Sequence, residues 1–370
     1  MATTFPTAQQ LHTRMGVGWN LGNTLDAHPH GDRAHMGITT PLSTLETLWG
    51  NPVTTRENLQ AIREAGFDTL RIPVTWYNKL TSWQTFGNEI IIRPDFMNRV
   101  EQVVNWALEL GFITILNVHH DERLLLLHDH EVEQSLKNIV SLWEQIGIHF
   151  AHHSHDLIFE GMNEPRTIGS ELEWNGGTPE ERRNINRLTQ AFVDTIRAQG
   201  SNNPNRVLML STYAAAVLPQ VLDDFVVPSD PTHSHNMFII GAHQYAPWEF
   251  AGSLGDNQRR HFDPTDPAHA NSVTRGLDLL TNRFISQGIP VAMTETGVIN
   301  RGDAYTPYRV AWTQFKRAQA SQRGIPLVWW DNGRWDGTSL SEDDGDFFAL
   351  LDRATNTWPF PELLSALVGQ

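Results

Sequence analysis

Apolar and polar residues alternate along the chain in two repeating patterns. Short runs rich in apolar and β-branched residues have the length of buried strands, and longer segments with an apolar residue at every third or fourth position have the period of amphipathic helices. Strands are predicted at residues 15–21, 67–72, 112–118, 156–160, 206–210, 237–242, 289–294 and 326–330. Helices are predicted at residues 54–65, 94–110, 131–150, 179–198, 214–225, 268–287 and 306–322, and as a broken pair near 346–353 and 361–368.

Two of the predicted helices begin with a capping box, in which a Thr side chain and an acidic side chain three residues later each accept the other's backbone N–H. Thr54 with Glu57 predicts the first box, and Thr178 with Glu181 predicts the second. Pro179 also occupies the first helical position, which favours proline. These signals place the two helix starts independently of the apolar faces.

Eight strand–helix units in succession indicate a parallel sheet whose apolar strands are covered by helices on both faces. A length of 370 residues would allow two or three domains, but no linker or low-complexity tract divides the chain. We therefore predict an α/β fold, a single (β/α)8 TIM-barrel domain over residues 1–370 without a carbohydrate-binding module, with its active site at the C-terminal ends of the strands. A doubly wound open sheet is the alternative, although no G-x-G-x-x-G turn follows the first strand.

The composition excludes several classes of protein. The 27 Lys and Arg against 42 Asp and Glu give a net charge of −15, which argues against nucleic acid or an anionic membrane as a partner. Without cysteine there is no disulfide, no Cys-ligated metal and no cysteine nucleophile. Residues 1–10 lack a signal-peptide pattern, and no apolar run is long enough to span a membrane. The 13 tryptophans remain to be explained.

Polar, ionisable and indole side chains collect where seven of the predicted strands end. The carboxyl ends of the strands are where barrel enzymes hold their active sites. The strand ends read Trp19-Asn20-Leu21-Gly22-Asn23-Thr24, Arg71-Ile72-Pro73-Val74-Thr75-Trp76, Asn117-Val118-His119-His120-Asp121, Gly161-Met162-Asn163-Glu164-Pro165-Arg166, Ala242-His243-Gln244-Tyr245, Thr294-Glu295-Thr296-Gly297 and Trp329-Trp330-Asp331-Asn332.

Two glutamates, Glu164 and Glu295, each follow an apolar strand directly. A single loop glutamate is usually only solvated, but Asn163 precedes the first of these two, and His243 and Tyr245 follow another strand. Glycosidic cleavage needs such a pair, because one carboxylic acid protonates the leaving oxygen while a second carboxylate attacks the anomeric carbon. The pair therefore predicts a glycoside hydrolase.

These motifs resemble glycoside hydrolase family 5, in the clan of retaining glycosidases built on (β/α)8 barrels. The resemblance rests on Asn163-Glu164-Pro165, Glu295, Arg71, His119 and His243-x-Tyr245, each after its own strand. Residues 18–26, 71–76, 159–166 and 329–333 are most similar to subfamily 4, the endo-β-1,4-glucanases, and the resemblance extends from Thr13 to Leu367. Thr296 departs from the pattern, since many relatives carry an aromatic residue there.

The resemblance implies a retaining double displacement in which Glu164 is the general acid/base and Glu295 is the nucleophile. Arg71 is expected to keep Glu295 ionised, and Tyr245 to donate a hydrogen bond to the same carboxylate. The two carboxyl groups are expected to lie roughly 5–5.5 Å apart, the retaining geometry.

The resemblance also implies contacts with the sugar. Asn163 is expected to hold the 2-hydroxyl, and His119 and His243 to position hydroxyls and the acid/base. Only one of the neighbours Trp329 and Trp330 can face the barrel mouth, and Trp330 is the preferred stacking ring. Further supporting residues are His120 and Asn23, the latter preferred over Arg166.

The tryptophans divide into two sets by position. Those within helical stripes are assigned to the core: Trp106, Trp143 and Trp312. Those at strand ends or in the loops beyond them, where flat rings can stack on pyranose faces or wall the barrel mouth, are Trp19, Trp49, Trp76, Trp174, Trp248, Trp329, Trp330 and Trp335.

Two rival classes share some of these features. A metal-dependent hydrolase would use the histidine clusters at 119–122, 128–131 and 151–156, but the first strand ends without the His-x-His that it needs, so neither metal nor cofactor is expected. A non-catalytic carbohydrate-binding protein would use the same aromatic groove, but it would not require both carboxylates.

The expected partner is a β-1,4-glucan: cellulose, mixed-linkage β-glucan or xyloglucan. An endo-acting xylanase or mannanase on the same barrel is the alternative, because the loops at 26–49 and 166–178 carry no readable specificity code. Since polymeric substrates are met outside cells, we expect a secreted, monomeric enzyme.

Overall fold

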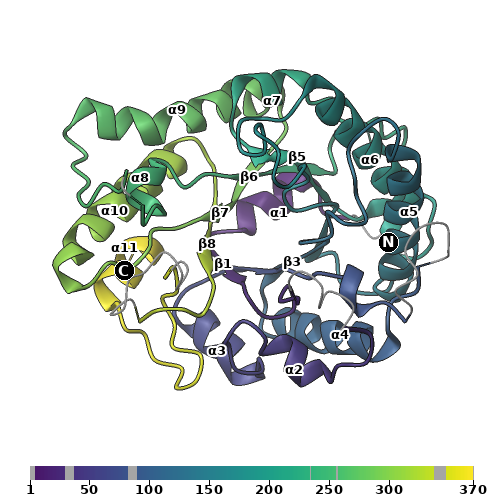
Figure 1. Ribbon diagram of the computed structural model, residues 1–370, viewed down its shortest axis with the longest axis horizontal. Coiled ribbons are helices and arrows are strands. Elements are labelled where there is room, and N and C mark those ends of the chain that lie inside the picture. The colour runs from purple at the N-terminus through teal and green to yellow at the C-terminus, as the bar shows by residue number, and fades with distance from the viewer. Residues whose placement is uncertain are drawn as a thin grey trace.

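The computed structural model describes residues 5–29, 37–81, 90–233, 235–255, 257–336 and 347–369. Eight strands form a closed barrel in chain order, and each neighbouring pair is parallel. The strands form a central ring with helices around it (Figure 1), which confirms the predicted (β/α)8 barrel. The strands are β1 (Gly18–Leu21), β2 (Thr69–Ile72), β3 (Ile113–Asn117), β4 (Leu157–Glu160), β5 (Leu208–Ala216), β6 (Phe238–His243), β7 (Val291–Thr296) and β8 (Leu327–Asp331).

The helices of the outer layer follow the strands along the chain. They are α2 (Leu42–Glu46), α3 (Arg56–Glu64), α4 (Pro94–Glu109), α5 (Val132–His149), α6 (Pro179–Arg197), α7 (Pro219–Asp224), α8 (Trp248–Ala251), α9 (Pro267–Arg283), α10 (Thr306–Gln322) and α11 (Pro361–Val368). Among the 3-10 turns that accompany them are η2 (Tyr77–Lys79), η3 (Asn203–Asn205), η4 (Ile285–Gln287) and η5 (Asp303–Tyr305). None of the helices in the described ranges is both long and apolar enough to cross a bilayer.

An additional helix, α1 (Ala8–Arg14), lies across the N-terminal end of the barrel. Figure 1 shows it inside the ring of strands. The Ala8 N–H donates to Asn236 just before β6, and His12 Nε2 lies 2.8 Å from the carbonyl of Val291 at the start of β7. Leu11 packs with the apolar side chains of the barrel interior. This helix closes the end opposite to the predicted site.

Alternation along the strands sorts their side chains into two layers. On β4, Leu157 and Phe159 join the core between barrel and helices, whereas Ile158 joins the cluster inside the barrel. Glu160 is two residues beyond Ile158 and therefore faces the interior as well. Arg71 on β2 is directed inward in the same way, so two opposite charges meet inside an apolar barrel.

The barrel closes between its first and last strands. Gly18 of β1 pairs with Val328 of β8. The amide nitrogen of Asn20 on β1 lies within hydrogen-bond distance of three carbonyls, those of Thr294 at 2.9 Å, Val328 at 3.4 Å and Trp329 at 3.1 Å. One side chain of the first strand is thus bonded to both of the last two strands.

The helix predicted at 214–225 is wrong in its first half. β5 continues to Ala216, and α7 begins only at Pro219. Ala214 and Ala215 have φ values of 50° and 49°, in the left-handed region that a right-handed helix excludes. Pro219 then takes the first helical position, where its missing N–H costs nothing. The second half of the broken C-terminal pair is confirmed by α11, but the described residues 347–353 form no helix.

The first predicted capping box is displaced by one residue. Thr55 and Asn58, rather than Thr54 and its partner three residues on, cap α3: the Asn58 N–H donates to Thr55 Oγ1 at 3.3 Å and the Thr55 N–H to Asn58 Oδ1 at 2.9 Å. An amide side chain fills the role that was assigned to an acid. The second predicted box, Thr178 with Glu181, is confirmed.

Candidate active site

A single arginine, Arg71 of β2, occupies the centre of the barrel mouth and is completely buried. Its Nε and Nη2 donate to the two carboxylate oxygens of Glu160 at 2.7 and 3.1 Å, and its Nη1 donates to Glu295 Oε1 at 2.7 Å. Burial disfavours a charged guanidinium, but the two carboxylates outweigh it and raise the pKa of Arg71. The side chain is therefore a fixed cation shared by two acids.

Two amides complete the hydrogen bonds of Arg71. Nη1 donates to Asn20 Oδ1 at 2.9 Å, and Nη2 donates to Asn163 Oδ1 at 2.7 Å. Because the oxygen of Asn163 faces Arg71, its NH2 group is directed elsewhere and is available to donate to a sugar hydroxyl. The predicted role of Asn163 at the 2-hydroxyl requires this orientation.

Glu160 is a member of the site that sequence reasoning missed. It is the last residue of β4, has no exposed surface and forms a two-point ion pair with Arg71. A signal was present, because an acid two residues after the inward-facing Ile158 of an apolar strand needs a buried cation as a partner. The motif reading instead concentrated on Glu164, four residues later.

Glu295 reaches the site because β7 is bulged. Ala242 of β6 pairs with Met293, but the next residue, His243, pairs with Glu295, so β7 contains one residue more than β6 over this step. A bulge of this kind bends the strand and redirects its side chains. Strict alternation would place Glu295 on the same face as the outward-packed Met293.

Glu164 follows β4 and is half-buried at the rim. Its Oε1 lies 2.6 Å from His243 Nδ1, and its Oε2 lies 3.6 Å from Arg166 Nη1. Burial raises the pKa of Glu164, with Arg166 and Arg71 acting in the opposite direction. Burial also lowers the pKa of His243 to about 4, so this ring is neutral near pH 7.

Glu295 accepts a hydrogen bond from the hydroxyl of Tyr245 at 3.0 Å, as predicted, in addition to the one from Arg71. Burial raises the pKa of Glu295 as well, while Arg71 opposes that rise. Only one of two neighbouring buried carboxyls ionises easily. Arg71 donates directly to Glu295, whereas the cation nearest to Glu164 is Arg166 at 3.6 Å, so Glu295 is the better placed of the two to hold the negative charge.

The two glutamates lie close together. A carboxylate oxygen of Glu164 and one of Glu295, together with a ring nitrogen of His243, all lie within 4.8 Å of one another. This is near the roughly 5–5.5 Å of retaining glycosidases and shorter than the roughly 6.5–9.5 Å at which inverting enzymes hold a water between the carboxyls. The geometry therefore fits direct attack by one carboxylate.

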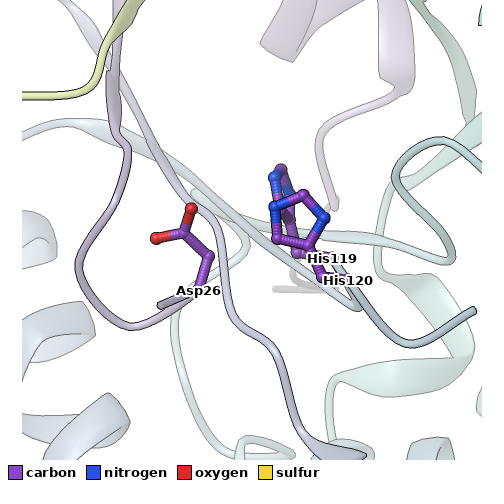
Figure 2. A group of neighbouring side chains, drawn as sticks. All are labelled: Asp26, His119 and His120. Carbon is purple, nitrogen blue, oxygen red and sulfur yellow. The ribbon is translucent and has the colours of Figure 1, made fainter. Parts of the chain in front are cut away.

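A second cluster is formed by Asp26, His119 and His120 (Figure 2). The orientation of Asn117 is fixed because its Oδ1 accepts the N–H of Val74, so its Nδ2 donates to His119 Nδ1 at 3.0 Å. Burial lowers the pKa of His119, and the neutral ring then carries its proton on Nε2. A ring that presents N–H suits a sugar hydroxyl, whereas a metal ion needs a free lone pair.

Two further predicted residues lie at the edge of the site. The ring of His120 packs edge-on against that of His119, with centroids 4.4 Å apart, and also lies near Trp49. Asn23 is half-buried at φ 59°, and its N–H donates to Asp26 Oδ2. Both lie on the β1 and β3 side of the mouth, away from Tyr245.

Trp330 is the ring of the β8 pair that reaches the mouth. It is partly exposed and stacks at 3° on His119 with the centroids 5.8 Å apart. The alternative, Trp329, is wrong as a sugar contact, because it has no exposed surface and donates its Nε1–H to the carbonyl of Phe348. Leu327 packs in the same layer as Trp329, as alternation requires.

The remaining tryptophans only partly follow the predicted division. Trp143 and Trp312 are buried as expected, and Trp106 is partly buried. Two of the predicted rim residues have no exposed surface and belong to the core: Trp19 on β1, and Trp76 in the segment between β2 and η2. Those with exposed or half-exposed rings are Trp49, Trp174, Trp248 and Trp335.

Comparison with known proteins agrees with this site. The family model described as cellulase (glycosyl hydrolase family 5) matches residues 33–336. The chain is 37% identical over 361 residues to the cellulase/esterase CelE of Acetivibrio thermocellus, covering 98% of this chain but only 40% of that protein. It is 34% identical over 363 residues to endoglucanase A of Ruminococcus albus, covering 98% of this chain and 92% of the relative.

A solved structure extends the similarity to the whole barrel. The GH5-4 broad specificity endoglucanase from Ruminococcus champanellensis, solved with bound cellotriose, is 36% identical, superposes with a TM-score of 0.90 and covers 100% of both chains. This confirms the predicted resemblance to subfamily 4. The chain, with its paired glutamates at the C-terminal ends of β4 and β7, belongs to glycoside hydrolase family 5.

Proposed function

We propose that this chain is a retaining endo-β-1,4-glucanase. The observation that carries the proposal is the pair Glu164 and Glu295, whose oxygens lie within 4.8 Å of each other while only Glu295 touches the buried cation Arg71. That arrangement gives one protonated and one ionised carboxyl at the spacing of a double displacement.

In the first step, an ionised oxygen of Glu295 attacks the anomeric carbon and the bond to the leaving oxygen breaks. Glu164 transfers its proton to that oxygen, so the leaving sugar departs as an alcohol. Tyr245 and Arg71 hold the nucleophile by its two oxygens, which fixes its direction of attack. The NH2 of Asn163 is free to strengthen its contact with the 2-hydroxyl as positive charge develops on the ring.

In the second step, Glu164 is ionised and removes a proton from a water molecule, which attacks the anomeric carbon and releases Glu295. His243 touches Glu164 at 2.6 Å in its neutral form, so it positions the carboxyl without adding a competing charge. Two inversions at one carbon give net retention. Proton NMR of the first products should show the β-anomer, and a first-formed α-anomer would overturn the mechanism.

The polysaccharide partner is supported by the relatives. Solved structures 32–36% identical to this chain include a lichenase with cellotetraose and a xyloglucan-specific endo-β-1,4-glucanase with cellotriose, besides the broad specificity endoglucanase. We expect this chain to cleave mixed-linkage β-glucan and cellulose derivatives, with xyloglucan as a further substrate. Initial rates on barley β-glucan, carboxymethyl cellulose, xyloglucan, xylan and mannan would decide among these.

Replacement of the nucleophile tests the proposal directly. Glu295→Gln keeps the size and the hydrogen-bonding oxygen but cannot attack, so hydrolysis of every glucan should be lost while binding of cello-oligosaccharides remains. Hydrolysis at the wild-type rate would exclude Glu295 as nucleophile. A wild-type chain that binds but never hydrolyses would instead be a carbohydrate-binding protein.

The expected location and oligomeric state of the enzyme follow from its polymeric substrate. We propose that it acts outside the cell and as a monomer, because an insoluble or very long glucan is met there and needs an open cleft. Size-exclusion chromatography with light scattering, and assays of culture fluid against cell extract, would test these statements.

A further inference from the structure

We propose that Arg166 is a positioning residue for the acid/base, which sets both the place and the protonation of Glu164 and connects that carboxyl to the loop 167–177. This inference rests on the proposed glycosidase function. Sequence reasoning left Arg166 open as a second-choice sugar contact, but its bonds lie within the protein.

The guanidinium lies directly behind Glu164. Its Nη1 donates to the backbone carbonyl of Glu164 at 3.0 Å and lies 3.6 Å from the carboxylate Oε2 of the same residue. The same Nη1 donates to Glu122 Oε1 at 2.8 Å, in the segment that follows β3. Only 10% of the Arg166 side chain is exposed, so the guanidinium is held within the protein and does not extend into solvent.

The other side of the guanidinium is bonded to the loop. Nε donates to Glu173 Oε1 at 3.0 Å, and Glu173 Oε2 accepts the N–H of Gly169 at 2.7 Å. The charged group also lies over the ring of Trp174, 4.4 Å from its centroid, and 58% of that residue is exposed. Arg166 therefore connects the acid/base to this loop through its bond to Glu173.

Several charged or titratable groups face Glu164. They are Arg166 and Glu173 from its own loop, Arg71 from β2, Glu122 from the segment after β3, His243 and Tyr245 from β6, and Glu295 from β7. Arg166 is the cation that separates Glu164 from Glu122 and Glu173, which are 11% and 16% exposed. Without it, three carboxyls would share one poorly solvated space and the protonated form of Glu164 would be favoured.

The charge of Arg166 lowers the pKa of Glu164, whereas the charge of Glu173 raises it. Two variants should therefore move the basic limb of the pH profile of kcat/KM in opposite directions, because that limb reports the loss of the proton from Glu164. Arg166→Met should move it to higher pH, and Glu173→Gln should move it to lower pH. Arg166→Lys keeps the charge but not the planar fork, so it should return the limb toward that of wild type.

Rates on two substrates separate positioning of the acid from a general loss of structure. Arg166→Met should lower kcat on cellopentaose by about tenfold to a hundredfold, because a misplaced acid transfers its proton poorly. On 2,4-dinitrophenyl β-cellobioside the leaving group needs no proton, so kcat/KM should change by less than about twofold. A variant that is merely misfolded would lose both activities together.

Arg182→Met is the matched control. Arg182 bonds to the carbonyls of Gly176 and Gly177 at the far end of the same loop and to Asp224. Its loss should leave the basic limb in place. The proposal is overturned if Arg166→Met and Glu173→Gln leave the limb unmoved, or if both substrates lose rate equally. A wild-type chain inactive on the dinitrophenyl substrate would contradict the proposed function instead.

Discussion

Replacement of Arg71 by methionine should lower the free energy of unfolding of the barrel substantially and should also abolish catalytic activity. The substitution removes the hydrogen bonds that the guanidinium donates to Glu160, Glu295, Asn20 and Asn163, while the length of the side chain is nearly kept. What remains in the barrel is a fully buried Glu160 carboxylate with no cation.

The size of the loss follows from that burial. Breaking a buried ion pair by removing one partner costs about 3–5 kcal/mol, since the remaining charge is left desolvated. Both oxygens of Glu160 lose their donors, so the upper part of that range is expected.

Urea unfolding followed by tryptophan fluorescence measures this loss, and a second variant isolates its cause. Arg71→Met combined with Glu160→Gln removes the orphaned charge, so the double variant should be more stable than Arg71→Met alone by about 1–3 kcal/mol. A cost for Arg71→Met below about 1 kcal/mol, the value of an exposed pair, would refute the reasoning. So would a double variant no more stable than the single one.

Four further variants test other contacts. Tyr245→Phe removes the hydrogen bond to Glu295. Because a hydrogen bond to a charged group is worth about 1.5–3 kcal/mol, kcat should fall by about tenfold or more with little change in KM. Steady-state rates on barley β-glucan would measure this fall. Trp330→Ala should lower kcat/KM on cellopentaose without loss of stability. Trp329→Ala should instead lower the free energy of unfolding in urea by about 3–5 kcal/mol, because its ring is buried in the core. If both variants changed kcat/KM and stability to the same extent, the assignment of Trp330 to the mouth and Trp329 to the core would be contradicted. Thr55→Ala should destabilise the protein by about 1 kcal/mol through loss of the α3 cap, and a change within error in the same unfolding assay would dismiss that cap.

The feature of the site that could be predicted is the convergence of polar residues at one rim, which follows from the parallel arrangement of the strands. In a closed parallel barrel all strands end at one rim, so polar residues after apolar runs must converge, and Arg71, Glu164 and Glu295 could be placed at the same rim from their positions. Their separate roles came from the resemblance to family 5. The same logic predicted that only one of Trp329 and Trp330 faces the mouth. It did not decide which, because the exact strand register sets the face.

What escaped prediction depends on contacts between distant strands. The bulge that directs Glu295 into the site is defined by pairing with β6, which no local pattern reveals. Glu160 was overlooked because its partner lies 89 residues earlier in the chain. The false helix start near Ala214 shows the converse: three alanines have a strong helical preference, and the backbone nevertheless stays in β5 and its left-handed turn.

The closure of the barrel at Asn20 has a consequence for how the protein is made. Arg71 and Glu160 both belong to the first half of the chain, so both partners of this buried ion pair are synthesised before β5. The amide of Asn20, in contrast, waits for Thr294 and Trp329, near the end of translation. Glu295 lies on β7, one of the two strands that Asn20 joins to β1, so the nucleophile is added with the strands that close the barrel.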